Sequence, residues 1–105
     1  MLRLVAAILL LATPALAAPG TKAAIKADYD TVCNAPERSG ALKKSESERM
    51  QVIIDYLLKN LKTDEVRNFL GTLGTRMPNE RGSALKQAAK DAGYTGSCKF
   101  ADMAT

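Results

Sequence analysis

The chain has 105 residues, a formal net charge of +4, two cysteines and no histidine. This length fits one small domain. The lack of histidine excludes a histidine general base, a histidine-ligated metal and a serine or cysteine nucleophile activated by histidine. Two cysteines are also too few for a four-cysteine zinc site or an iron–sulfur cluster.

The first residues have the order of a secretory signal peptide. Arg3 precedes an uninterrupted apolar run over 4–12, and Ala15-Leu16-Ala17 places small residues where a signal peptidase cleaves. The run is too short for a mature transmembrane helix, which needs about 20 residues. We therefore predict a signal peptide at 1–17 and a single exported domain at 18–105, periplasmic or extracellular, with no membrane span after cleavage. An uncleaved N-terminal anchor is the alternative.

The first helix of the mature domain is predicted over 21–33. Thr21 is suited to its N-cap. One helical face is apolar and carries Ile25, Tyr29, Val32 and Cys33, whereas Asp28 falls outside this face. Residues 34–40 are predicted to form a loop with a short capped turn, in which Gly40 lets the backbone change direction.

The helix predicted over 46–61 is the clearest element. Ser45-x-x-Glu48 matches a capping box, with Ser47 as a competing cap. An unbroken apolar stripe follows at helical spacing: Met50, Ile53, Ile54, Leu57, Leu58 and Leu61. We expect this whole stripe to lie in the core.

Two shorter helices are predicted over 64–73 and 78–92. Thr63 or Asp64 caps the first of them, and Gly93 suits the position after the end of the second. The last residues, with Phe100 and Met103, are expected to form either a lid or a frayed tail. Because no segment alternates apolar and polar residues, the predicted fold class is all-α: a small bundle of four short helices.

The two cysteines are predicted to form a disulfide that stabilises this bundle. In an oxidising compartment an even cysteine count indicates a disulfide framework, and two cysteines allow one intramolecular pair, Cys33 with Cys98. A loop this long is worth roughly 4 kcal/mol in the chain-entropy model. A redox-active pair is the alternative, although catalytic pairs usually have Cys-x-x-Cys spacing.

Two surface patches are candidates for binding. Val52 and Tyr56 lie one turn apart on the 46–61 helix, away from its main stripe, and either another element covers them or they anchor a partner. Arg38, Lys43 and Lys44 form the best candidate for an anion-binding patch. The positive charge is otherwise spread thinly and without interleaved aromatic residues, so nucleic acid is not a predicted partner.

Two short segments of the chain have similar sequences, an internal echo of one another. Residues 37–44 read ERSGALKK, and residues 80–87 read ERGSALKQ. The similarity does not extend outward, which favours coincidence over duplication. A true repeat would give two similar arginine-bearing turns on one surface.

The sequence contains no recognisable catalytic, cofactor-binding or metal-binding motif. We therefore expect a non-enzymatic protein-binding module that is monomeric or weakly associating and needs no cofactor. The alternative is an accessory module that contacts anionic cell-envelope polymer or lipid headgroups through the basic patch. An enzyme that uses only carboxylate, lysine and tyrosine groups is a third hypothesis.

Overall fold

Every regular element in residues 20–103, the part of the chain described by the computed structural model, is helical. The four predicted helices are α2 (Lys22–Cys33), α4 (Glu46–Asn60), α5 (Asp64–Leu73) and α6 (Pro78–Asp91). The all-α prediction is therefore confirmed, and the ends of these helices agree with the predicted ends to within one residue. The predicted signal peptide at 1–17 lies outside the described residues.

The predicted count of four helices is too low. A short helix, α3 (Ala35–Arg38), occupies most of the segment 34–40 predicted as a loop, and a 3-10 helix, η1 (Ala41–Lys43), follows it. Another short helix, α7 (Lys99–Met103), forms where a lid or a tail was expected. Elements of about one turn are too short to develop helical periodicity, so the sequence pattern cannot distinguish them from turns.

Local capping explains where α2 and α5 begin and where α6 ends. The Thr21 hydroxyl accepts from the amide of Ala24 at 3.1 Å, and the Thr63 hydroxyl accepts from the amide of Val66 at 3.3 Å. Gly93 follows α6 with φ of +93°, a conformation that glycine adopts without strain. The amide of the next residue, Tyr94, donates to the carbonyl of Ala89, as in a Schellman motif.

The capping box predicted at α4 is not formed. Ser45 is the N-cap residue, but its side chain makes no hydrogen bond to the helix backbone. Its hydroxyl instead lies 2.9 Å from the Glu48 carboxylate, to which it donates. The two side chains satisfy each other rather than the free amides at the helix end.

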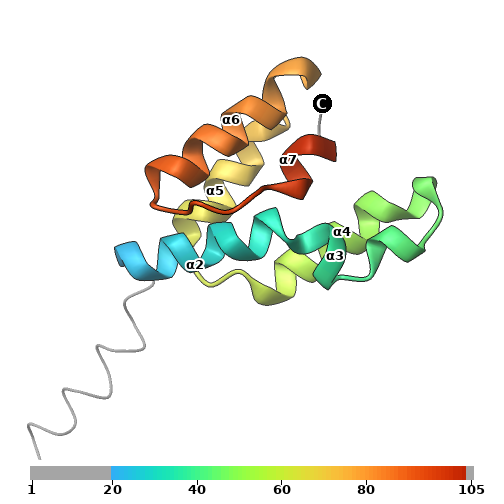
Figure 1. Cartoon of the computed structure of the whole chain (residues 1–105), viewed down its shortest axis with the longest axis horizontal. Coiled ribbons are helices and arrows are strands. Elements are labelled where there is room, and N and C mark those ends of the chain that lie inside the picture. Colours follow the sequence, from blue (N-terminus) through green and yellow to red (C-terminus); the bar gives the residue numbers. More distant parts are fainter. Residues whose placement is uncertain (1–19, 104–105) are drawn as a thin grey trace, which may run out of the picture.

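Helix α2 is the centre of the arrangement (Figure 1). Its backbone contacts α4, α5, α6 and α7. Helices α3, η1 and α4 pack together, and the α5–α6 hairpin forms the other part of the fold. Helix α7 lies between α6 and the α2–α3 segment and contacts all three. None of the helices in residues 20–103 is both long and apolar enough to cross a membrane.

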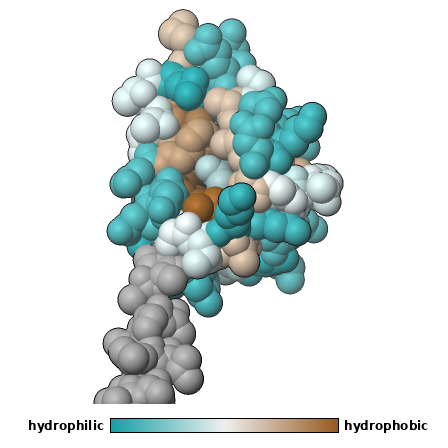
Figure 2. All heavy atoms as spheres, turned by 90° about the vertical axis from the view of Figure 1, so that its left-hand side faces the viewer, coloured by the Kyte–Doolittle hydropathy of each residue, from teal (hydrophilic) through white to brown (hydrophobic). Residues whose placement is uncertain are grey.

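The core lies where these helices meet. Side chains with no exposed surface come from four helices: Val32, Ile53, Val66 and Leu85. Tyr29 packs edge-on against Phe69 with ring centroids 6.0 Å apart. Burial raises the pKa of the Tyr29 hydroxyl above its usual value. At the end of the molecule where α2 begins, a narrow apolar strip lies on the surface between hydrophilic side chains (Figure 2).

A buried carboxylate joins α2 to the link between α4 and α5. Asp28 is only 2% exposed, although the sequence pattern places it off the apolar face of α2. Its carboxylate accepts from the amides of Lys62 at 3.0 Å and Thr63 at 2.7 Å, and from the Thr63 hydroxyl at 2.7 Å. These amides lie where the chain leaves α4, so Asp28 replaces the hydrogen bonds that a continued helix would have made.

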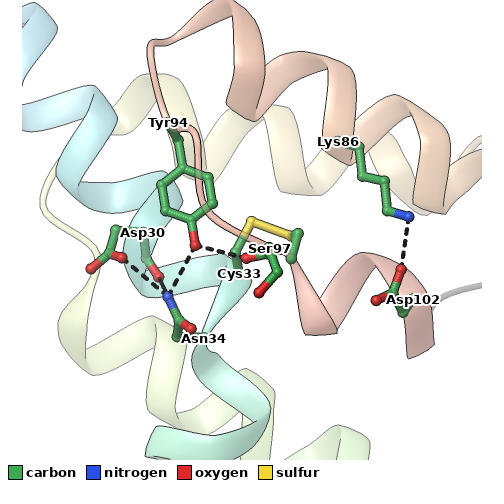
Figure 3. Close-up of a disulfide and its surroundings, with 8 residues drawn as sticks. Asp30, Cys33, Asn34, Lys86, Tyr94, Ser97 and Asp102 are labelled. Atoms are coloured by element: carbon green, nitrogen blue, oxygen red, sulfur yellow. Dashed lines mark hydrogen bonds and ion pairs between the residues drawn. A yellow bond between two sulfur atoms is a disulfide. The ribbon is translucent and has the colours of Figure 1, made fainter.

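The predicted disulfide between Cys33 and Cys98 is confirmed (Figure 3). It ties the end of α2 to the residue before α7. Beside it, the Tyr94 hydroxyl donates to the Ser97 carbonyl at 2.7 Å and accepts from the Asn34 side chain at 3.3 Å. These contacts hold the last segment against α2, and an ion pair of 2.7 Å between Lys86 and Asp102 links α6 to α7.

Candidate functional site

The apolar stripe of α4 is only half buried, which corrects the expectation that all of it lies in the core. Ile53, Leu57 and Leu61 are buried, whereas their neighbours Met50, Ile54 and Leu58 are 45%, 41% and 68% exposed. The backbone of α4 lies close to those of α2, α3 and η1 but not to those of α5, α6 or α7, all within the described residues. One side of the stripe is therefore left without a covering helix.

The uncovered side of α4 forms one wall of an apolar groove. The groove has a volume of about 440 Å³, and its other walls come from α5, α6 and α7. Its lining residues are Met50, Ile54, Leu57, Leu70, Leu73, Gly74, Arg81, Leu85, Phe100 and Met103. Apolar side chains gathered around an open groove are typical of an interaction surface. Two of them are methionines, which adapt their shape readily to a bound partner.

Among the described residues, Arg81 is the one charged residue in the lining of this groove. It lies in the first turns of α6 and is half-buried. Its Nε donates to the carbonyl of Arg76 at 3.2 Å, and its Nη2 donates to the carbonyl of Gly74 at 3.3 Å. These two bonds hold the guanidinium against the turn between α5 and α6. No carboxylate within residues 20–103 forms an ion pair with Arg81.

Arg49 makes the same type of backbone contact at the start of α4. Its Nε donates to the carbonyl of Lys44 at 3.2 Å and its Nη2 to the carbonyl of Leu42 at 3.5 Å. Both arginines therefore bond to carbonyls five and seven residues earlier, and each fastens its helix to the preceding turn. Arg49 does not line the groove. It is thus a natural structural match for Arg81.

The Val52 and Tyr56 pair lies on a different side of α4. Both side chains are half-buried and pack against the core. They border a shallow hollow that also includes Ser39, so the segment between α3 and η1 partly covers this side of the helix. The pair exposes less apolar surface than Met50, Ile54 and Leu58. Its role as a partner anchor stays a prediction.

The predicted anion patch lies around α3 and η1. Arg38 pairs with Asp30 at 3.1 Å, and this hydrogen bond raises the pKa of the guanidinium. Lys43 and Lys44 are exposed at the end of η1. Because Asp30 neutralises part of the charge, the patch consists mainly of two lysines. Its role as an anion site stays a prediction.

The echo between residues 37–44 and 80–87 does not produce two similar structures. The first copy runs from α3 through Gly40, whose φ is +83°, into η1. The second copy is continuous helix within α6. Residues at matching positions of the two segments therefore adopt different conformations. The two similar turns expected from a true repeat are not formed.

Sequence reasoning did not single out the groove or Arg81. The exposed residues belong to the recognised stripe of α4, but a stripe gives no sign of which part remains uncovered. In residues 20–103 no group of three or more acidic or cysteine side chains is arranged to hold a metal ion. Comparison with protein-family models, curated protein sequences and solved structures gave no match for this chain.

Proposed function

We propose that this chain is an exported helical binding protein whose apolar groove receives an amphipathic helix of a partner protein. The observation that carries the proposal is the exposed line of Met50, Ile54 and Leu58 on α4. The first two line the groove, and the third extends the same line by one turn. The proposal includes no catalytic role.

The shape of this surface favours a helix as the occupant. Residues spaced four apart on α4 form a ridge about 12 Å long, which is slightly more than two helical turns. A partner helix can lie along such a ridge and insert residues at i, i+3 or i+4, and i+7 into the neighbouring groove. An extended strand would need an unpaired sheet edge, and residues 20–103 contain no strand.

The energetic cost of the exposed ridge also supports an interaction surface. Burying a large aliphatic side chain is worth about 1.5–3 kcal/mol. A domain of this size has a small core, so leaving such residues uncovered forgoes stability that it could use. A partner that covers them recovers this free energy on binding.

The disulfide supports the exported part of the proposal. Bonds of this type persist in oxidising compartments such as the periplasm and the extracellular space. The cleavage prediction has a direct test, because N-terminal analysis of protein recovered from a secreting host should begin near Ala18. Retention of Met1 would contradict cleavage at this site.

Site-specific photo-cross-linking in the producing cells tests the binding surface. A photoreactive amino acid replaces Leu58, and a matched variant carries it at Lys90, an exposed position of α6 outside the groove. We expect adducts from position 58 that map to a helical segment of another protein, are missing from position 90 and are lost in an Ile54→Lys background. Equal adducts from both positions, or none from position 58, would refute the proposal.

Two further outcomes identify other kinds of binding. Adducts between copies of this chain would make the groove a self-association surface and overturn the proposal of a different partner. Binding to anionic polymer through Arg38, Lys43 and Lys44 would weaken strongly with salt and survive Ile54→Lys. Such behaviour would replace the proposal with the basic-patch alternative.

A further inference from the structure

The charge of Arg81 restricts which helix the groove can accept. A guanidinium in an apolar groove loses water when a ligand covers it, and an uncompensated charge is expensive to desolvate. Within residues 20–103 no carboxylate forms an ion pair with it. A partner that covers the groove must therefore supply a hydrogen-bond acceptor for Arg81. A partner without one should bind more weakly.

The geometry prepares Arg81 for such an acceptor. Its Nε and Nη2 are engaged by the carbonyls of Arg76 and Gly74. Its Nη1 has no hydrogen-bond partner among the described residues. A guanidinium fixed in this way loses little conformational entropy when it binds, which favours a directed bond to one carboxylate oxygen.

We infer that the groove selects an acidic amphipathic helix, in which an aspartate or glutamate beside the apolar stripe bonds to Nη1 of Arg81. This inference rests on the proposed function, because it names the partner's chemistry at the same site. The apolar contacts with Ile54 and its neighbours supply most of the affinity. The carboxylate supplies selectivity and fixes the direction in which the helix lies.

Arg49 provides the control that separates charge recognition from folding. Arg49→Gln and Arg81→Gln remove the same pair of bonds to backbone carbonyls of a preceding turn. Only Arg81→Gln also removes a cation from the groove. Similar losses of stability in the two variants, measured by thermal unfolding, would show that any difference in binding has another cause.

The test is selection from a displayed library of helical peptides against the oxidised protein, with the Arg81→Gln, Arg49→Gln and Ile54→Lys variants alongside. On the wild type and Arg49→Gln we expect an apolar stripe together with an enriched aspartate or glutamate at one position. On Arg81→Gln the stripe should persist without the acidic residue. Ile54→Lys should remove the enrichment of both.

A defined peptide pair tests the same contact from the peptide side, on the wild-type protein. Replacing the selected glutamate by glutamine should weaken binding to the wild type roughly tenfold, the scale of one charge-assisted hydrogen bond. The same exchange should leave binding to Arg81→Gln unchanged.

The outcomes separate the two proposals. An apolar stripe without acidic enrichment on the wild type, or equal affinity of the two peptides, overturns the role of Arg81 and leaves the groove as a helix site. Absence of any Ile54-dependent stripe overturns both.

Discussion

Replacement of Asp28 tests the buried link between α2 and the start of α5. Its carboxylate accepts from the amides of Lys62 and Thr63 and from the Thr63 hydroxyl. In Asp28→Asn one carbonyl oxygen remains to accept, but the other oxygen becomes an amide group that faces donors. In Asp28→Ala all three donors lose their acceptor.

The size of the effect follows from these contacts. A hydrogen bond to a charged group contributes about 1.5–3 kcal/mol, and contributions within one network are not additive. Lys62 is exposed, so water can partly replace the acceptor at its amide. We therefore expect Asp28→Asn to lower the free energy of unfolding by about 2–3 kcal/mol and Asp28→Ala by about 3–4 kcal/mol. Each kilocalorie corresponds to roughly 4–8 °C in the melting temperature of a domain this small.

The assay is urea unfolding of the oxidised protein, followed by circular dichroism and analysed by linear extrapolation. Asp55→Asn is the matched control, because Asp55 is exposed and, among residues 20–103, accepts from Gln51 only. Its expected change is below about 0.5 kcal/mol. An Asp28→Asn variant as stable as this control would refute the structural role of Asp28. A double-mutant cycle with Thr63→Val should also show coupling, since the two side chains are 2.7 Å apart.

Three other predictions concern the disulfide, the buried tyrosine and the two sides of α4. Reducing the Cys33–Cys98 bond, which spans 65 positions, should lower stability by about 4 kcal/mol in urea titrations with and without reductant; an unchanged midpoint would contradict this. Because burial raises the pKa of Tyr29 above 10.0, its contribution is fully present below that pH and is lost as pH rises through the folded pKa. Stability should then fall less steeply above pH 10.0 in Tyr29→Phe than in the wild type, and identical pH profiles would count against this burial effect. Ile53→Ala should cost about 2–4 kcal/mol and Ile54→Ala less than 1 kcal/mol, so equal losses in chemical denaturation would mean that both sides of the α4 stripe are buried.

Local features of the fold could be predicted from the sequence because their causes are local. Thr21 and Thr63 cap helices through atoms three residues away, and Gly93 ends α6 through its own backbone freedom. The pairing of Cys33 with Cys98 is distant in the chain but was the single intramolecular choice that two cysteines allow.

Residues whose roles depend on distant partners could not be predicted in this way. Asp28 meets donors 34 and 35 positions later, so its place off the apolar face of α2 gave no sign of burial. Arg81 became a candidate binding residue only when α4, α5, α6 and α7 were seen to enclose one groove. The basic composition alone did not distinguish it from the other cations.

Helix α4 shows most clearly what the sequence determines and what the tertiary structure decides. Its sequence determines that Met50, Ile53, Ile54, Leu57, Leu58 and Leu61 share one broad apolar face, because helical periodicity fixes the angles between side chains. The tertiary structure decides which part of that face is covered, because this depends on where other helices pack. Here α4 packs beside α2, α3 and η1. Ile53 and Leu57 are buried, while Ile54 and Leu58 remain exposed. The same periodic pattern thus serves the core on one side and the proposed binding groove on the other.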